Sequence, residues 1–219
     1  MKIFFRLVVL FIAMILASCG GSGGGGDSSG SETGVRILNG SIEAPPIELM
    51  MEGLSGDNTA VKFAEAGTRF SITGEAVNIS GKSKASGNIV AGVSVPAERN
   101  GSYSLLIYGP RSGGRFNAKL LNDIVDNQAP STIKIRVVNA VNKSAGITAS
   151  LNSGAPFLVE FGEASPYQSI QPGTLNSVIK TLGGSIISNR TFDAGSGNKF
   201  TLLITGEEDY LVFSRLIVD

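Results

Sequence analysis

Short runs of alternating apolar and polar residues fill most of the chain after residue 34. In "YSLLIYG" the alternation places Tyr103, Leu105 and Ile107 on one face of a strand, and "FTLLITG", residues 200–206, repeats the pattern with threonines on the opposite face. Gly, Asn, Pro and Ser interrupt these runs at a spacing of roughly 10 residues, which is typical of turns between strands. No long apolar stripe with helical spacing is present in this part of the chain. The pattern therefore predicts an all-β fold.

The chain contains two similar halves. About six or seven short strands fit within each half, the number expected of a small sandwich. We therefore predict two tandem small antiparallel β-sandwich (Ig-like) domains, at residues 35–123 and 133–219, with a short joint at residues 124–132. A single fused sandwich would need long crossover connections. Four segments recur in the same order, with 35–41 matching 135–141, 61–72 matching 159–170, 100–109 matching 197–206, and 118–123 matching 214–219.

The first residues have the pattern of an export signal. Lys2 and Arg6 precede an apolar stretch at residues 7–17. A helix needs about 20 apolar residues to cross a bilayer, so this stretch is too short to be a membrane span. We expect it to be the core of a signal peptide that comprises residues 1–18.

The signal ends in Leu16-Ala17-Ser18-Cys19, which resembles the lipobox of bacterial lipoproteins. The resemblance implies that cleavage falls just before Cys19, that its sulfur carries a diacylglycerol, and that its new amino group is acylated. At roughly 0.8 kcal/mol per buried CH₂, several acyl chains hold a protein on a membrane where a single one does not. Gly20 in place of Asp favours the outer membrane, by resemblance to enterobacterial sorting rules. The alternative is a plain signal peptide followed by an unmodified cysteine.

A flexible tether is expected at residues 19–34. Residues 20–34 contain only Gly, Ser, Thr, Asp and Glu, so they have no apolar side chain to bury against the entropy cost of ordering. As a random coil of this length, the segment would separate its ends by about 20 Å on average. Its expected role is to hold the folded part away from the lipid headgroups.

The composition narrows the chemistry that the protein can perform. The 18 basic residues are balanced by 18 acidic ones, so no basic face is indicated and no nucleic-acid partner is expected. The chain has no His, which removes the usual general base near neutral pH and the commonest transition-metal ligand. A single Cys forms no internal disulfide and no Cys/His zinc site. We therefore expect no cofactor and no metal site.

The stretches "VRILNGSIEAPPIEL", "VEFGEASPYQSIQPG" and "LLNDIVDNQAPSTIKIRVVNA" resemble the bacterial domain-of-unknown-function 4397 family. In that family a strand of the form V-R-hydrophobic-hydrophobic-N/H-A opens each unit, a segment like F-G-x-A-S-P-Y follows, and an acidic-Asn-x-Ala-Pro joint links tandem copies. The second copy here has this segment nearly whole at residues 161–167, whereas the first copy, at residues 63–68, lacks the Pro and the Tyr. The resemblance implies an exported, often lipid-anchored protein with paired β-domains, and it supplies no catalytic residues.

Several short stretches carry candidate chemistry. Arg111 and Arg115, on the Gly-rich loop "GPRSGGR", could bind an anion, although a hairpin turn uses the same residue types. The acidic run at residues 207–209 could ligate Ca²⁺, but its spacing is not that of a calcium loop, and a solvated turn explains it. Ser165, in "SPY", has no His to act as its base, so we interpret this segment as a turn at a sandwich edge. The four tyrosines are scattered among strands, where half-buried sheet positions explain them better than a sugar-stacking platform.

Together these patterns indicate a lipid-anchored cell-envelope protein with two β-domains and a non-catalytic binding or structural role. Its expected partners are the membrane, through the N-terminal lipid, and an envelope protein or glycan. Two alternatives stay open. A carboxylate-based envelope hydrolase would need two acidic groups about 5–10 Å apart in a cleft. A carrier of small apolar ligands would need a cavity between the sheets.

Overall fold

The fold was analysed in a computed structural model, which describes residues 33–51, 59–72, 76–96, 100–109, 115–124, 131–195 and 198–219. The predicted signal peptide with its lipobox lies outside the described residues, and so does the predicted lipidation site, Cys19. Leu16, Ala17 and Ser18 of the lipobox and Arg111 of the predicted anion loop likewise fall outside them. In the part of the chain that the structure describes, no helix is long and apolar enough to cross a membrane.

The first repeat is built from strands β1 to β7. Strand β1 begins at Thr33, two residues before the predicted start of the first repeat. The described strands are β1 (Thr33–Asn39), β2 (Ile47–Met51), β3 (Phe70–Ile72), β4 (Val77–Ser83), β5 (Ile89–Val95), β6 (Ser102–Tyr108) and β7 (Asn117–Asn122).

The second repeat is built from strands β8 to β15. Its β10 corresponds to a shorter element in the first repeat, where Val61 forms an isolated bridge with Ile47. The described strands are β8 (Ile133–Asn142), β9 (Gly146–Leu151), β10 (Phe157–Glu160), β11 (Gln168–Ile170), β12 (Gly173–Thr181), β13 (Ile186–Ala194), β14 (Lys199–Glu207) and β15 (Leu211–Val218).

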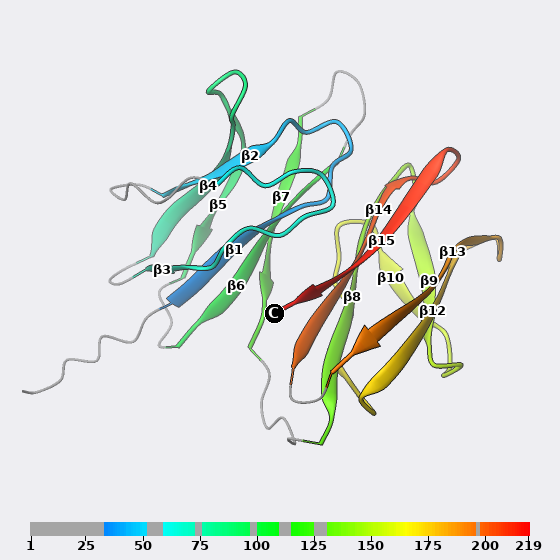
Figure 1. Cartoon of the computed structure of the whole chain (residues 1–219). Coiled ribbons are helices and arrows are strands. Elements are labelled where there is room, and N and C mark those ends of the chain that lie inside the picture. The colour runs from blue at the N-terminus through cyan, green and yellow to red at the C-terminus, as the bar shows by residue number, and fades with distance from the viewer. Residues whose placement is uncertain are drawn as a thin grey trace, which may run out of the picture. The chain divides into compact units, whose positions relative to one another are not determined.

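Each repeat is a sandwich of two sheets (Figure 1). The first repeat has the strand orders β3-β1-β6-β7 and β2-β4-β5, and the second has β11-β8-β14-β15 and β10-β9-β12-β13. The four segments that recur in the sequence therefore occupy the same positions in the two sandwiches. The predicted all-β class, with a sandwich in each half of the chain, is confirmed.

One strand pair in each repeat departs from the predicted antiparallel arrangement. Strand β1 runs parallel to β6, with Val35 opposite Tyr103, and β8 runs parallel to β14, with Ile135 opposite Phe200. All other ladders among the described strands are antiparallel. Parallel strands are usually covered on both faces, and these four strands are buried on both faces.

Each sandwich has its own apolar core between its two sheets. The predicted inward face of β6, with Tyr103, Leu105 and Ile107, belongs to the first core. The predicted face of β14, with Leu202 and Ile204, belongs to the second. The alternation in these strands therefore predicted their inward residues correctly.

A third apolar cluster joins the two sandwiches. Because side chains alternate across a strand, the residues between the inward ones project from the opposite face of the sheet. In β1, β6, β8 and β14 these residues are buried as well, and they pack against one another across the two repeats. The cluster, called here the junction, consists of Leu38, Leu106, Leu121, Val138, Ala140, Leu203 and Ile217.

Candidate functional site

Two arginines lie within the apolar strands β1 and β8, on the faces that meet at the junction. Arg36 and Arg136 are only 4% and 2% exposed. They occupy the same place in the two copies of the opening strand, since "VRIL" and "IRVV" are equivalent. A buried guanidinium costs several kcal/mol unless its donors and charge are satisfied, so the surroundings of these two side chains decide what the site can do.

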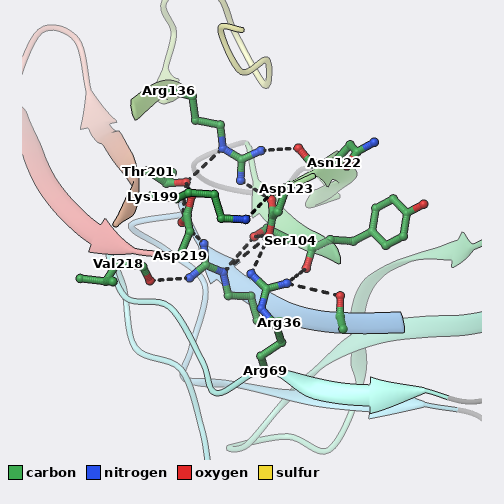
Figure 2. Close-up of polar contacts among 12 residues, drawn as sticks. Arg36, Arg69, Ser104, Asn122, Asp123, Arg136, Lys199, Thr201, Val218 and Asp219 are labelled. Carbon is green, nitrogen blue, oxygen red and sulfur yellow. Dashed lines mark hydrogen bonds and ion pairs between the residues drawn. The ribbon is translucent and has the colours of Figure 1, made fainter. Parts of the chain in front are cut away.

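Arg136 of the second repeat is satisfied largely by the first repeat (Figure 2). Its Nη1 donates to the backbone oxygen of Asn122 at 2.9 Å, and its Nη2 donates to the carboxylate of Asp123. Within its own repeat, its Nε donates to the hydroxyl of Thr201 at 3.0 Å. The Arg136 guanidinium also lies 4.9 Å from the centre of the Tyr167 ring, in cation–π contact.

Arg36 makes the same three kinds of hydrogen bond with the repeats exchanged. Its Nη1 donates to the backbone oxygen of Val218 at 2.9 Å, and its Nη2 donates to the carboxylate of Asp219. Its Nε donates to the hydroxyl of Ser104 at 2.9 Å. Each repeat thus supplies an arginine to the other repeat's aspartate, which is the arrangement of a two-fold, isologous interface within one chain.

Three further side chains complete this buried cluster. Arg69 donates to Asp123 at 2.8 Å, and the Tyr167 hydroxyl donates to Asp219 at 2.6 Å. Lys199 donates to the backbone oxygen of Asp123 at 2.9 Å. Among the described residues, no buried side-chain nitrogen or oxygen lacks a hydrogen-bond partner. A fully satisfied network of this kind fixes one arrangement of the groups that it joins.

Burial and neighbouring charges shift three pKa values in the cluster. Burial alone would raise the pKa of Asp219, but Arg36, the hydrogen bond from Tyr167 and Arg136 together hold it below the ordinary value. Burial raises the pKa of the Tyr167 hydroxyl, and its hydrogen bond to Asp219 adds to the effect. Burial lowers the pKa of Lys199 against the opposing influence of the aspartates.

A cleft of about 560 Å³ adjoins this cluster, a volume within the usual range for small-molecule sites. One wall is β7 of the first repeat, and the other is the segment from Glu163 to Tyr167 of the second, which runs beside β8. An ion pair between Lys119 and Glu163 and the contact of Arg136 with Asn122 both bridge the two walls. The cleft is lined by Leu120, Leu121, Asn122, Ile124, Arg136, Glu163, Ala164, Ser165, Pro166 and Tyr167.

The lining combines an apolar surface with a polar rim. Pro166 is exposed and Tyr167 half-buried, and Ile124 is 40% exposed. The carboxylate of Glu163 and the side chain of Asn122 are accessible at the rim. The guanidinium of Arg136 contributes shape rather than an available charge, because each of its three nitrogens already donates within the protein.

A second cavity, of about 580 Å³, lies on the sheet β2-β4-β5 of the first repeat. Gly92, opposite Ser80 in the ladder, lacks a side chain there and so deepens the surface. The cavity is lined by Met50, Met51, Asn78, Ile79, Ser80, Ile89, Gly92, Val93 and Ser94.

The residues that the sequence singled out for chemistry have other surroundings in the structure than a binding site would give them. Arg115 is exposed just before β7, outside both cavities, and its proposed partner Arg111 is outside the described residues. Ser165 is buried, and its hydroxyl accepts a hydrogen bond from the backbone N–H of Val137. The interpretation of residues 165–167 as a turn is wrong, because this segment runs beside β8, where Ala164 forms a bridge with Val138. The solvated-turn interpretation of residues 207–209 is wrong for Glu207, which is 2% exposed at the end of β14 and ion-paired with Lys143.

The buried cluster was not predicted from the sequence. Arg36 and Arg136 lie in apolar runs, and their aspartates close the segments "LLND" and "LIVD". A charged residue at the same place in both copies of an apolar strand is the signal that could have found them, since an unpaired charge is not tolerated there.

Comparison with known proteins identifies no family. No protein-family model matches the chain, and no curated protein matches its sequence. Among solved structures, similarity is found to a family CBM26 module from Eubacterium rectale Amy13K in complex with maltoheptaose, with 9% identity, a TM-score of 0.29, and coverage of 84% of this chain and 97% of that one. A leucine-rich repeat protein from Bacteroides thetaiotaomicron has 6% identity and a TM-score of 0.22, and the match covers 81% of this chain and 26% of that one. Both TM-scores are low, and no ligand or activity is transferred from either protein.

Proposed function

We propose that the chain is a lipid-anchored cell-envelope protein whose two sandwiches act together as one non-catalytic binding module, with the cleft between the repeats as its binding site. The observation that carries the proposal is the exchange of arginine–aspartate pairs between the repeats. Because the pairs Arg36–Asp219 and Arg136–Asp123 hold the two sandwiches in one arrangement, the two walls of the cleft are fixed in place. A preformed site of this kind reduces the entropy cost of ordering the protein when a ligand binds.

The chemistry of the acidic groups favours binding over hydrolysis. Asp123 and Asp219 are brought into one cluster, as a carboxylate mechanism would require. Both side chains are fully buried and paired with arginines, and the pKa of Asp219 is lowered. A general acid at neutral pH needs a raised pKa instead, so this pair is suited to holding the repeats together.

The packing of the two sandwiches favours a surface site over an internal carrier cavity. Fourteen and thirteen buried residues, respectively, fill the cores between the sheets of the second and first repeats. Both cavities described above are open clefts rather than spaces enclosed between the sheets. A carrier for small apolar ligands would enclose its cargo between the sheets.

The anchoring part of the proposal rests on the sequence "LASC" and on the tether that follows it. Its test is uptake of labelled palmitate by cells that express the wild-type chain or Cys19→Ala. We expect label on the wild type only, in the outer-membrane fraction, and release of the variant from the membrane. Equal labelling of the two proteins would overturn the anchoring proposal.

The binding part can be tested with a protein that starts at residue 20, because residues 31–219 form one compact unit that contains both cores. Membrane, peptidoglycan and polysaccharide fractions of bacterial envelopes would be sedimented with it. We expect the wild-type protein to co-sediment with one of these fractions. In Pro166→Trp the larger side chain fills the cleft, so most of this co-sedimentation should be lost. Asn189→Trp, at an exposed position of β13, is the matched control and should bind as the wild type does. Equal binding by both variants would contradict the assignment of the cleft.

A further inference from the structure

The cleft departs from the two-fold arrangement that governs the rest of the junction. The equivalent position in the other half of the molecule lies beside β15 and the segment Glu65 to Arg69. There the bridging ion pair is kept, with Arg215 and Glu65 in place of Lys119 and Glu163. The arginine beneath the cleft is also kept, as Arg36 in place of Arg136. The framework is therefore common to both halves.

The residues that line the cleft are the ones that change. Tyr167 is replaced by Arg69, and the side chain of Arg69 turns inward to Asp123 and to the backbone oxygens of Gly34 and Tyr103. The exposed Asn122 is replaced by the apolar Val218. Along the segment itself, Ser165 and Pro166 are replaced by Gly67 and Thr68. The aromatic and proline surface and the amide at the rim thus occur on one side only.

This one-sided lining has the chemistry of a sugar site. A neutral pyranose ring has an apolar C–H face and a rim of hydroxyl groups, and Tyr167 with Pro166 offers an apolar surface for the former. The carboxylate of Glu163 can accept hydrogen bonds from the hydroxyl rim. The amide nitrogen of Asn122 can donate to it, while the amide oxygen already accepts from the backbone N–H of Ile124. On the side of the first repeat, the lining of the cleft runs from Leu120 to Ile124.

The electrostatics of the cleft disfavour anions and wholly apolar ligands. An anion would find no available guanidinium, because the three nitrogens of Arg136 donate to protein groups. Glu163 adds a negative charge at the rim, with Lys119 as its partner. A wholly apolar ligand would have to desolvate these charged groups without replacing their hydrogen bonds, at a cost of several kcal/mol.

We propose that the cleft between β7 and residues 163–167 binds a neutral hexopyranose unit of a glycan, with Tyr167 and Pro166 against the sugar ring and Glu163 and Asn122 on its hydroxyls. This inference rests on the proposed function and narrows it to one class of ligand. Glu163 is a positioning residue for the hydroxyl groups, and its charge makes each hydrogen bond about twice as strong as that of a neutral amide.

The test is titration of the ¹⁵N-labelled protein, from residue 20 onward, with cellopentaose, maltopentaose, chitopentaose and, as charged and apolar probes, oligogalacturonate and laurate. We expect saturable shifts of amide signals from β7 and residues 163–167 with at least one neutral oligosaccharide. Glu163→Gln, which keeps the size of the side chain, should weaken binding about fivefold. Glu65→Gln makes the same change at the equivalent position outside the cleft, and it should bind as the wild type does.

Three outcomes would overturn the inference. One is the absence of binding by every neutral oligosaccharide, the second is binding by the charged or apolar probe alone, and the third is equal weakening in Glu163→Gln and Glu65→Gln. Envelope binding that Pro166→Trp abolishes, together with any of these results, would leave the proposed function in place and exclude a neutral sugar held by Glu163 as the ligand of the cleft. If the wild-type protein binds neither an oligosaccharide nor an envelope fraction, both proposals are rejected.

Discussion

One turn has a residue with left-handed backbone conformation in both repeats. In the first repeat it follows the bridge at Val61, and in the second it follows β10. Ala64 has a φ of 59°, and the equivalent Gly162 has a φ of 77°. The backbone N–H of Ala64 donates to the backbone oxygen of Asn39, and that of Gly162 donates to the backbone oxygen of Asn139, both at 2.8 Å. An alanine in this region carries about 1 kcal/mol of strain, which glycine avoids.

We predict opposite effects of exchanging these two residues. Ala64→Gly should stabilise the protein by about 0.5 kcal/mol, because relief of the strain exceeds the added entropy of the unfolded chain. Gly162→Ala should destabilise it by about 2–4 kcal/mol, since a Cβ there would lie 2.4 Å from the ring of Tyr108 in addition to the strain. Urea unfolding of the two variants measures both effects. A destabilised Ala64→Gly, or a neutral Gly162→Ala, would contradict this account of the turn.

The carboxylate of Asp219 should make the stability of the protein sensitive to acid. Its pKa in the folded state lies below the ordinary value of about 4, because Arg36, Tyr167 and Arg136 favour the charged form more than burial opposes it. This stabilisation is complete above the ordinary pKa and is lost as the pH falls through the lower folded-state pKa.

We therefore predict that Asp219→Asn reduces the free energy of unfolding at pH 7 and flattens its decline as the pH falls below about 4. Asp193→Asn, at an exposed position of β13, is the matched control and should keep the slope of the wild type. Thermal unfolding at a series of pH values would measure both. A slope for Asp219→Asn equal to that of the wild type would show that the carboxylate does not stabilise the junction.

At the scale of strands, the sequence predicted the inward residues but not the fate of the opposite face. Leu202 and Ile204 lie in a core as the alternation indicates, yet Thr201 and Thr205, on the opposite face of the strand, are also fully buried. Thr201 bonds to Asp219, and Thr205 bonds to the backbone oxygen of Gly40 in the other repeat. Alternation within one strand carries no information about a second domain that covers its outer face.

The candidate site escaped prediction for a similar reason. The Gly-rich loop with Arg111 and Arg115 attracts attention because its residues are neighbours in sequence, whereas Arg36 and Asp219 are separated by almost the whole length of the described chain. Local patterns predict turns and faces, since these depend on adjacent residues. The partner of a buried charge depends on how two repeats dock, and only the occurrence of the same arginine in both copies hinted at it.

At the scale of the whole described chain, the two repeats form an interface of the kind found in symmetric dimers, with an apolar centre and paired charges. Leu106 and Leu203 lie at equivalent positions in this centre and are fully buried. Because both repeats belong to one chain, their association has no concentration dependence, and a short joint keeps the effective concentration high. The two sandwiches should therefore unfold together although each has its own core.

We predict a single calorimetric unfolding transition for residues 20–219, and two separate transitions for Leu106→Asp. The substitution buries an unpaired carboxylate in the junction at a cost of several kcal/mol, but the same side chain faces water once the repeats separate. The sandwiches should then stay folded individually, with the first core intact because Leu106 does not belong to it. Ile89→Asp, at a position 67% exposed on β5, is the control and should keep one transition. Two transitions in the wild type, or one in Leu106→Asp, would show that the junction does not couple the repeats.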